Sequence, residues 1–207
     1  MIDVIHTNYG PSSAEHDTLV ERGCTIDNYG LPVNPDVAHV LGTYGLRFGK
    51  GKFWQWGPND TADAIIIAPD NSGSETQPRV LTIMRRDNGK YAIPGGFIDS
   101  GEDADNAVVR EAWEETGLEI SNAKRQVIYR GHVRDDRETL HAWPETTAFL
   151  VLLDEIVSAN FGDDATGDEY PWKTEAEIEA ITDWHGSHYQ LIKSGFKRWY
   201  ELRANTI

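Results

Sequence analysis

The 207-residue chain has few cysteines, few basic residues and no long apolar run. Its single cysteine, Cys24, excludes a disulfide within the chain and favours a reducing compartment. Lys and Arg number 19 against 34 Asp and Glu, a net charge of −15, which disfavours a basic surface for nucleic acid or membrane. The longest apolar run, Ala148 to Leu153, is far too short to span a bilayer. We therefore expect no nucleic-acid partner and no membrane partner.

The first ten residues also lack the basic segment and apolar core of a secretory signal. Together with the single cysteine, this leads us to expect a cytoplasmic protein. Hydrophobic residues make up 39% of the chain and charged residues 26%, which is typical of globular proteins. A chain of this length can bury a sizeable core without a disulfide or a structural metal.

Composition divides the chain into an N-terminal extension and a main domain. Residues 1–60 are rich in Gly, Pro and Asn, and their apolar residues show little periodicity. This composition predicts turns, and the aromatic stretch from Gly42 to Gly57 predicts short strands or an ordered loop rather than a helix. Residues 61–207 contain both strand and helix patterns. We therefore predict an irregular, aromatic-rich extension or cap over 1–60 and one α+β domain over 61–207.

Hydrophobic patterning predicts the elements of the main domain. The segment from Asp103 to Thr116 has no Gly or Pro and predicts a helix that Gly117 ends. The spacing of Thr174 and Glu177 matches a capping box at a helix start. A last helix is expected over 188–202, and Pro94-Gly95-Gly96 is expected to end a strand. Short apolar or alternating runs predict strands over 64–68, 79–85, 91–93, 126–133 and 146–153.

Three glutamates on the first predicted helix are the strongest candidates for chemistry. Glu111, Glu114 and Glu115 are spaced i, i+3 and i+4, so they share one helix face. One interpretation is a solvated acidic face, which is ordinary in a protein this acidic. The other is a site for a hard divalent cation, because such ions prefer carboxylate oxygens.

Residues around these glutamates could complete a cation site. The Gly95-Gly96 turn could offer a backbone carbonyl, because glycine lets the backbone approach closely. We expect Arg110 not to reach across its helix to the glutamate face. It could instead pair with Glu102 and hold the preceding loop against the helix.

The stretch from Gly96 to Leu118 resembles the Nudix box, the signature of the Nudix hydrolases, at every defined position. A chance match is on the order of one in a billion per window. The resemblance implies an α/β/α sandwich around a mixed sheet. It also implies that Mg²⁺ or Mn²⁺ is bound and that water attacks a pyrophosphate linked to a nucleoside. The metal ligands it implies are Gly95, Glu111, Glu114 and Glu115, and the three glutamates are also the expected catalytic residues.

Other segments are similar to the ADP-ribose pyrophosphatase branch of this family, which is related to the human mitochondrial enzyme. These segments are Trp56–Asp63, Ile83–Asp87, Tyr91–Gly96 and Val133–Thr139. This resemblance implies hydrolysis of ADP-ribose to AMP and ribose 5-phosphate. The sequence departs from the branch at Leu140 and His141, where small polar residues are usual.

The resemblance also suggests residues outside the box. Relatives place a catalytic base either in a box glutamate or in an acidic loop, where Asp164 is our choice and Asp163 and Glu169 are alternatives. Arginine offers phosphates a bidentate fork, and an aromatic ring could stack on adenine. The candidate substrate-binding residues are Asp63, Arg85, Arg86, Phe97, Arg137, His185 and His188.

Two alternatives stay open at this point. The first is a Nudix hydrolase acting on another nucleoside diphosphate derivative, such as NADH or a nucleotide sugar. The second is a non-catalytic ADP-ribose-binding module, because the branch includes the sensing domain of a cation channel whose box is degenerate in some animals. The presence of Glu111, Glu114 and Glu115 favours hydrolysis.

Overall fold

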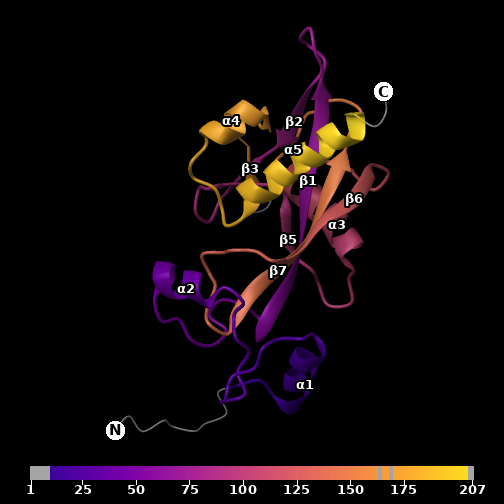
Figure 1. Ribbon diagram of the computed structural model, residues 1–207. Helices are drawn as coiled ribbons and strands as arrows, with labels where there is room; N and C mark the ends of the chain where they lie inside the picture. The colour runs from indigo at the N-terminus through magenta and orange to yellow at the C-terminus, as the bar shows by residue number, and fades with distance from the viewer. Residues whose placement is uncertain (1–9, 163–164, 168–169, 205–207) are drawn as a thin grey trace. The chain divides into compact units, whose positions relative to one another are not determined.

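The computed structural model describes residues 10–162, 165–167 and 170–204 (Figure 1). They divide into two compact units: unit 1 holds residues 10–59 and 132–145, and unit 2 holds residues 60–131 and 146–204. The first division, after Asn59, lies close to the boundary that composition suggested. Residues 132–145, which we had placed in the main domain, group instead with the N-terminal residues.

Unit 1 contains two short helices that the sequence analysis did not predict. Helix α1 (Ser13–Glu21) begins with a capping box: the Ser12 hydroxyl accepts the Glu15 N–H at 3.3 Å, and the Glu15 carboxylate accepts the Ser12 N–H at 2.7 Å. Helix α2 (Val37–Tyr44) ends at Gly45, which has a φ of 75°. The prediction of strands or a loop from Gly42 was therefore wrong for the last turn of α2.

Unit 2 is built on a sheet in which the strands pair in the order β6–β7–β1–β2–β9, with β5 also paired to β1. A second, smaller sheet has the order β4–β3–β8. The strands of the larger sheet are β1 (Gly57–Asp70), β2 (Gln77–Leu81), β5 (Gly95–Phe97), β6 (Lys124–His132), β7 (Ala142–Leu152) and β9 (Trp172–Lys173). Those of the smaller sheet are β3 (Ile83–Arg85), β4 (Tyr91–Ala92) and β8 (Ala165–Thr166).

Strand β1 is buried on both faces by helices. Its residues Ala62, Ala64 and Ile66 join one core cluster with Ala107, Val108 and Ala112 of helix α3 (Ala104–Thr116). On the opposite face a Cβ added at Gly195 of helix α5 (His188–Ala204) would lie 2.5 Å from Ile65 Cγ2. Successive strand residues point to opposite faces, so this alternation builds the expected α/β/α sandwich.

The helix predictions for unit 2 are confirmed. The Asp103 side chain caps α3 by accepting the Asn106 N–H at 2.8 Å, and Gly117 ends it with a φ of 67°. Helix α4 (Glu175–Ala180) begins with the expected capping box, in which Thr174 and Glu177 exchange hydrogen bonds. Among the described residues we find no helix with the length and apolar character that a bilayer span needs.

One strand prediction and one turn prediction were wrong. The run 79–85 divides at Thr82, because both the N–H and the hydroxyl of Thr82 bond to the Pro171 carbonyl instead of continuing one ladder. The Gly95-Gly96 segment is not a turn but the start of β5, which pairs antiparallel with β1 so that Gly95 lies opposite Asp63. This pairing brings the glycines beside the helix that carries the glutamates.

Candidate active site

The Glu111 and Glu115 carboxylates lie against the backbone of β5. The Gly95 N–H donates to Glu115 Oε2 at 2.9 Å, and Glu115 is only 6% exposed. A Cβ added at Gly96 would lie 2.4 Å from Glu111 Oε1, so any larger residue there would displace this carboxylate. The spacing of four residues on α3 and the two glycines of β5 together place two carboxylates at one point.

Burial sets the electrostatics of this pair. The pKa of Glu115 is raised to about 8, chiefly by burial; the neighbouring Glu111 and Asp63 carboxylates also raise it, whereas the Gly95 N–H and Arg85 lower it. Burial also raises the pKa of Glu111, and the Arg110 guanidinium opposes this shift. Buried carboxylates that repel one another are suited to hold a cation, which would relieve both the burial cost and the repulsion.

Arg110 connects the loop before α3 to the glutamate face. Its guanidinium donates to Glu102 at 2.8 and 3.0 Å, as the sequence predicted, and holds the pKa of Glu102 below its usual range. The guanidinium also donates to Glu111 at 2.7 Å and to Glu114 at 3.1 Å. The expectation that Arg110 would not reach this face was wrong, because its long side chain folds back along the helix and Glu114 is its i+4 neighbour.

Glu114 differs from the other two glutamates. Its side chain is 41% exposed, and its carboxylate bonds to Arg110 rather than to the β5 backbone. Within the described ranges 10–162, 165–167 and 170–204, no three His, Cys, Asp or Glu side chains form a ready-made metal cluster. The described geometry thus brings Glu111 and Glu115 together and leaves Glu114 at the rim.

Asp63, predicted to bind substrate, lies on β1 directly opposite Gly95 and is 5% exposed. Its Oδ2 accepts the hydroxyl proton of Thr146, a buried residue of β7. Sequence reasoning did not identify Thr146, because only the pairing of distant strands brings the two residues together. Its place at the start of the strand predicted over 146–153 was the available signal.

The two neighbouring arginines of unit 2 have different surroundings. Arg85 forms a bidentate pair with Asp87, with both contacts at 3.0 Å, and its charge lowers the pKa of Glu115. Arg86 donates from Nε to the Ala165 carbonyl at 3.2 Å. Phosphate binding by either arginine stays a prediction.

His185 and His188 tie the start of α5 to the strand before β5. The His188 Nδ1 accepts the Ile93 N–H at 3.0 Å, and the two imidazole rings lie edge to face with centroids 5.2 Å apart. His185 is buried, and its backbone N–H donates to the Tyr91 carbonyl at 2.8 Å. These contacts give both histidines a structural role, and ribose binding by either stays a prediction.

The remaining predicted site residues are Phe97 in unit 2, Arg137 in unit 1, and Asp164. The backbone carbonyl of Phe97 accepts a hydrogen bond from Arg110 at 3.0 Å, and substrate binding by Phe97 stays a prediction. Arg137 belongs to unit 1, where its guanidinium pairs with both oxygens of Asp135 at 2.7 Å and lies over the Phe53 ring. Phosphate binding by Arg137 stays a prediction. Asp164, with its alternatives Asp163 and Glu169, lies outside the described residues.

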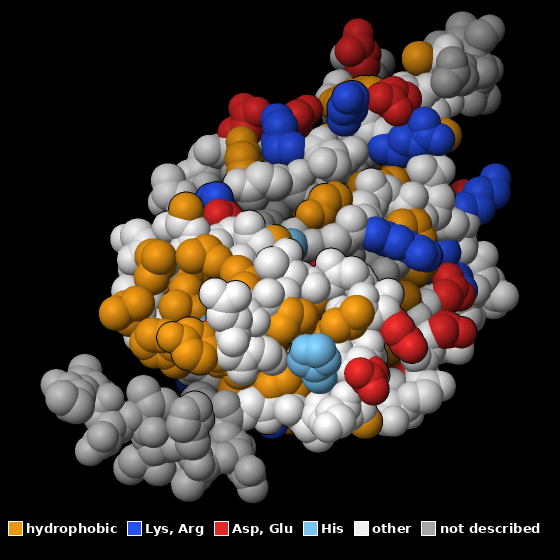
Figure 2. All heavy atoms as spheres, turned by 60° about the horizontal axis from the view of Figure 1, so that its bottom comes forward, with side chains coloured by type: hydrophobic (Ala, Val, Ile, Leu, Met, Phe, Trp, Pro, Cys, Tyr) orange, Lys and Arg blue, Asp and Glu red, His pale blue; other side chains and the backbone are white. Residues whose placement is uncertain are grey.

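Aromatic residues of unit 1 divide into buried and exposed sets. Phe53 and Trp56 are buried, which agrees with a packing role, whereas Phe48 and Trp54 are largely exposed. Phe48 stacks on His141, with centroids 5.9 Å apart. Figure 2 shows a face of the molecule on which hydrophobic side chains gather at the surface.

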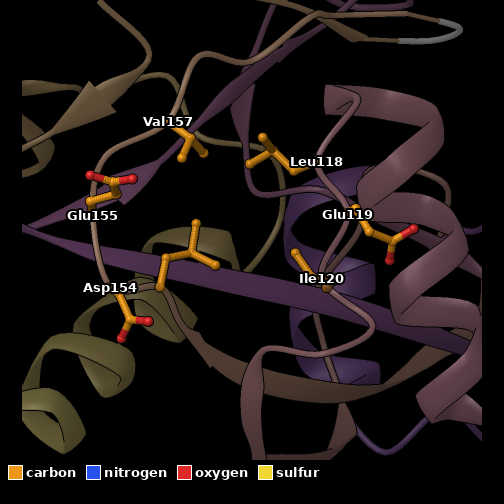
Figure 3. Close-up of a pocket in the computed structure, with 7 residues that line it drawn as sticks. Leu118, Glu119, Ile120, Asp154, Glu155 and Val157 are labelled. Carbon is orange, nitrogen blue, oxygen red and sulfur yellow. The ribbon is translucent and has the colours of Figure 1, made fainter.

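Unit 2 also has a pocket of about 340 Å³ between the end of α3 and the segment after β7. Its walls are apolar, and Figure 3 shows the Leu118 and Val157 side chains pointing toward each other across it. Glu119, Asp154 and Glu155 line its edge, and no basic side chain does. None of the residues that line the pocket belongs to β5 or to the glutamate pair on α3, so the pocket is separate from the candidate centre.

Comparison with known proteins agrees with this geometry. Residues 59–194 match the model of the NUDIX domain family. The chain is 36% identical to nudix hydrolase 6 of Caenorhabditis elegans, over 92% of this chain and 76% of that protein. It is 33% identical to the mitochondrial ADP-ribose pyrophosphatase of Rattus norvegicus, over 92% of this chain and 61% of that protein.

A solved structure shares the fold. The NUDIX domain of Shewanella oneidensis NrtR, crystallised with ADP-ribose, superposes with a TM-score of 0.56. The match covers 78% of this chain and 97% of the NrtR chain at 20% identity, so it supports the fold only. The box residues, the sandwich around a mixed sheet and the family match over most of the chain agree with one another. The chain belongs to the Nudix family of hydrolases.

Proposed function

We propose that this Nudix hydrolase cleaves the pyrophosphate bond of ADP-ribose to give AMP and ribose 5-phosphate in a Mg²⁺-dependent reaction. The observation that carries the proposal is the pair of half-buried Glu111 and buried Glu115, which lie against the Gly95-Gly96 backbone. The substrate is supported by the similarity to a rat protein named as an ADP-ribose pyrophosphatase. Because the chain spans 61% of that relative, its substrate is carried to this chain only as a proposal.

The donor atoms of the site fit Mg²⁺ or Mn²⁺. Both ions take oxygen ligands, and Glu111, Glu115 and the adjoining β5 backbone offer carboxylate and carbonyl oxygens in one place. Glu114 would join them by leaving Arg110, which keeps its bonds to Glu102. When bound, such a cation neutralises charge on the diphosphate and makes a coordinated water more acidic.

Residues of this chain would orient the substrate for the cleavage. The oxygen of a water molecule joins one phosphorus, and the bond from that phosphorus to the bridging oxygen breaks. The bridging oxygen leaves with the other phosphate, and the protons of the water are released to solvent because both product phosphates are ionised. Arg85, whose charge already acts on Glu115, is the arginine best placed to attract a diphosphate to this centre. Arg110 keeps the loop that follows β5 in place through Glu102 and the Phe97 carbonyl.

The test is AMP release from ADP-ribose at millimolar Mg²⁺, with NADH, ADP-glucose, diadenosine polyphosphates and dGTP as comparison substrates. We expect AMP and ribose 5-phosphate from ADP-ribose, with kcat/KM at least about tenfold above every other substrate, a difference of about 1.4 kcal/mol. A higher kcat/KM for another substrate would agree with the proposed pyrophosphate hydrolysis but contradict ADP-ribose as the preferred substrate. ADP-ribose binding in calorimetry without product would refute hydrolysis and identify a binding module.

The affinity for Mg²⁺ should rise with pH. Because the pKa of Glu115 is about 8, this carboxyl is protonated in most metal-free molecules at pH 6 and must lose its proton to bind a cation. We expect the apparent Mg²⁺ affinity to rise by about tenfold per pH unit from pH 6 and to level off above pH 8. Calorimetry in buffers of different ionisation enthalpy would measure both affinity and proton release. An affinity that is constant from pH 6 to 9 would contradict the assignment of Glu115 as a ligand.

A further inference from the structure

The buried carboxylate of Asp63 has no part in the proposed chemistry so far. It lies on β1, where antiparallel pairing places it opposite Gly95, the residue whose N–H bonds to Glu115. A Cβ added at Gly95 would lie 2.3 Å from Asp63 Oδ1, so Asp63 stands immediately behind the β5 backbone. The β5 backbone therefore has Glu115 and Asp63 as neighbours.

The Thr146 hydroxyl fixes the orientation of this carboxylate. Thr146 is buried, and its hydroxyl donates to Asp63 Oδ2, with a longer contact of 3.5 Å to the Thr61 carbonyl. A threonine hydroxyl has one proton to donate, and a carboxylate oxygen is a strong acceptor of it, so this bond holds the Asp63 side chain in place. Strand β7 thereby holds a negative charge at a defined point of β1.

The charge of Asp63 reaches both glutamates. Asp63 is among the groups that raise the pKa of Glu111 and of Glu115, which means that it acts on both through the low-dielectric interior. The repulsion between Asp63 and the two glutamates is unfavourable in the metal-free protein. A cation held by the glutamates would be attracted by the same Asp63 charge. Substrate binding, the role suggested by sequence, does not require this arrangement.

We propose that Asp63 is a positioning residue of the cation site. Its charge strengthens divalent-cation binding by Glu111 and Glu115, although Asp63 is not itself a ligand. Thr146 holds this charge in place behind Gly95. The inference rests on the proposed function, because it needs a cation at these glutamates. It differs from that function in assigning part of the cation affinity to a strand outside the Nudix box.

The variant Asp63→Asn removes this charge and keeps an oxygen that can accept from Thr146. We expect its Mg²⁺ affinity, measured by calorimetry without substrate, to fall by about tenfold. The metal-free variant should unfold at a temperature about 2–4 °C higher than the wild type, because the repulsion is gone. Stabilisation by added Mg²⁺ should be smaller than in the wild type. A merely structural role would lower the unfolding temperature with and without Mg²⁺.

Asp70→Asn is the matched control, because it removes an aspartate charge from the far end of the same strand. Asp70 pairs with Arg79, away from the glutamates, and its loss should leave the Mg²⁺ affinity unchanged. An unchanged affinity in Asp63→Asn, with a raised KM for ADP-ribose, would refute the inference and favour substrate contact. Failure of the wild type to bind Mg²⁺ would refute the proposed function instead.

A measurement on the wild-type protein covers the case in which Asp63→Asn does not fold. Paramagnetic Mn²⁺ broadens the NMR signals of nearby nuclei with a steep dependence on distance. The amide signals of Asp63, Gly95 and Glu115 should broaden together at substoichiometric Mn²⁺. The signal of Asp70, seven residues further along β1 and so about 23 Å away, should persist. Persistence of the Asp63 signal while that of Glu115 disappears would overturn the inference.

Discussion

Replacing Glu115 with Gln is expected to lower kcat/KM for ADP-ribose by at least about a thousandfold, or about 4 kcal/mol of transition-state stabilisation. The amide keeps the size of the side chain and can still accept the Gly95 N–H at this position, but it carries no charge to hold a cation. Because burial raises the pKa of Glu115, removing its charge also removes an unfavourable contribution to the folded state. The variant should therefore unfold at the same temperature as the metal-free wild type or at a higher one.

Glu114→Gln is the control for this prediction. Glu114 is on the same helix and is also an acid of the box, but it is exposed at the rim and bonds to Arg110. We expect a loss of about tenfold in kcat/KM, because the remaining two glutamates keep their contacts with β5. Steady-state kinetics over a Mg²⁺ titration and thermal unfolding would separate the two variants. Near-normal turnover by Glu115→Gln, or an equal loss in Glu114→Gln, would contradict the assigned roles.

The helix that carries the site could be predicted because its determinants are local. The apolar spacing of Ala107, Val108 and Ala112, the cap at Asp103 and the glycine after Thr116 all lie within one short segment. The same spacing rule places Glu111 and Glu115 on one face. Helix α1 has an equally local determinant, the capping box from Ser12 to Glu15.

The surroundings of the glutamates could not be predicted, because distant segments supply them. The pairing of Asp63 with Gly95 and the bond from Thr146 depend on the register of strands that are far apart in sequence. A local reading took the Gly-Gly pair as a turn, whereas tertiary pairing with β1 makes it a strand. The assignment of residues 132–145 to unit 1 is likewise decided by long-range contacts, such as the bond from Asn34 to the Thr139 carbonyl.

The two glycines of β5 should respond differently to alanine. At Gly96 the added Cβ would meet the tip of the Glu111 side chain at 2.4–2.7 Å, and a flexible side chain can move away. At Gly95 the added Cβ would lie 2.7 Å from the Ala62 carbonyl and 2.9 Å from Asp63 Cα, and this backbone cannot move without opening the pairing of β1 with β5. One substitution therefore moves a carboxylate, and the other strains the sheet.

We expect Gly96→Ala to lower turnover of ADP-ribose by about a hundredfold, because a displacement of about 1 Å is enough to misplace a catalytic group. Its unfolding temperature should stay close to that of the wild type. Gly95→Ala should lose activity and also about 1–3 kcal/mol of unfolding free energy, the usual cost of overpacking. Denaturant unfolding alongside steady-state kinetics would measure both quantities. A fully active Gly96→Ala protein would show that the Glu111 carboxylate need not lie against β5, and the proposed cation site would then have to be moved away from these glycines.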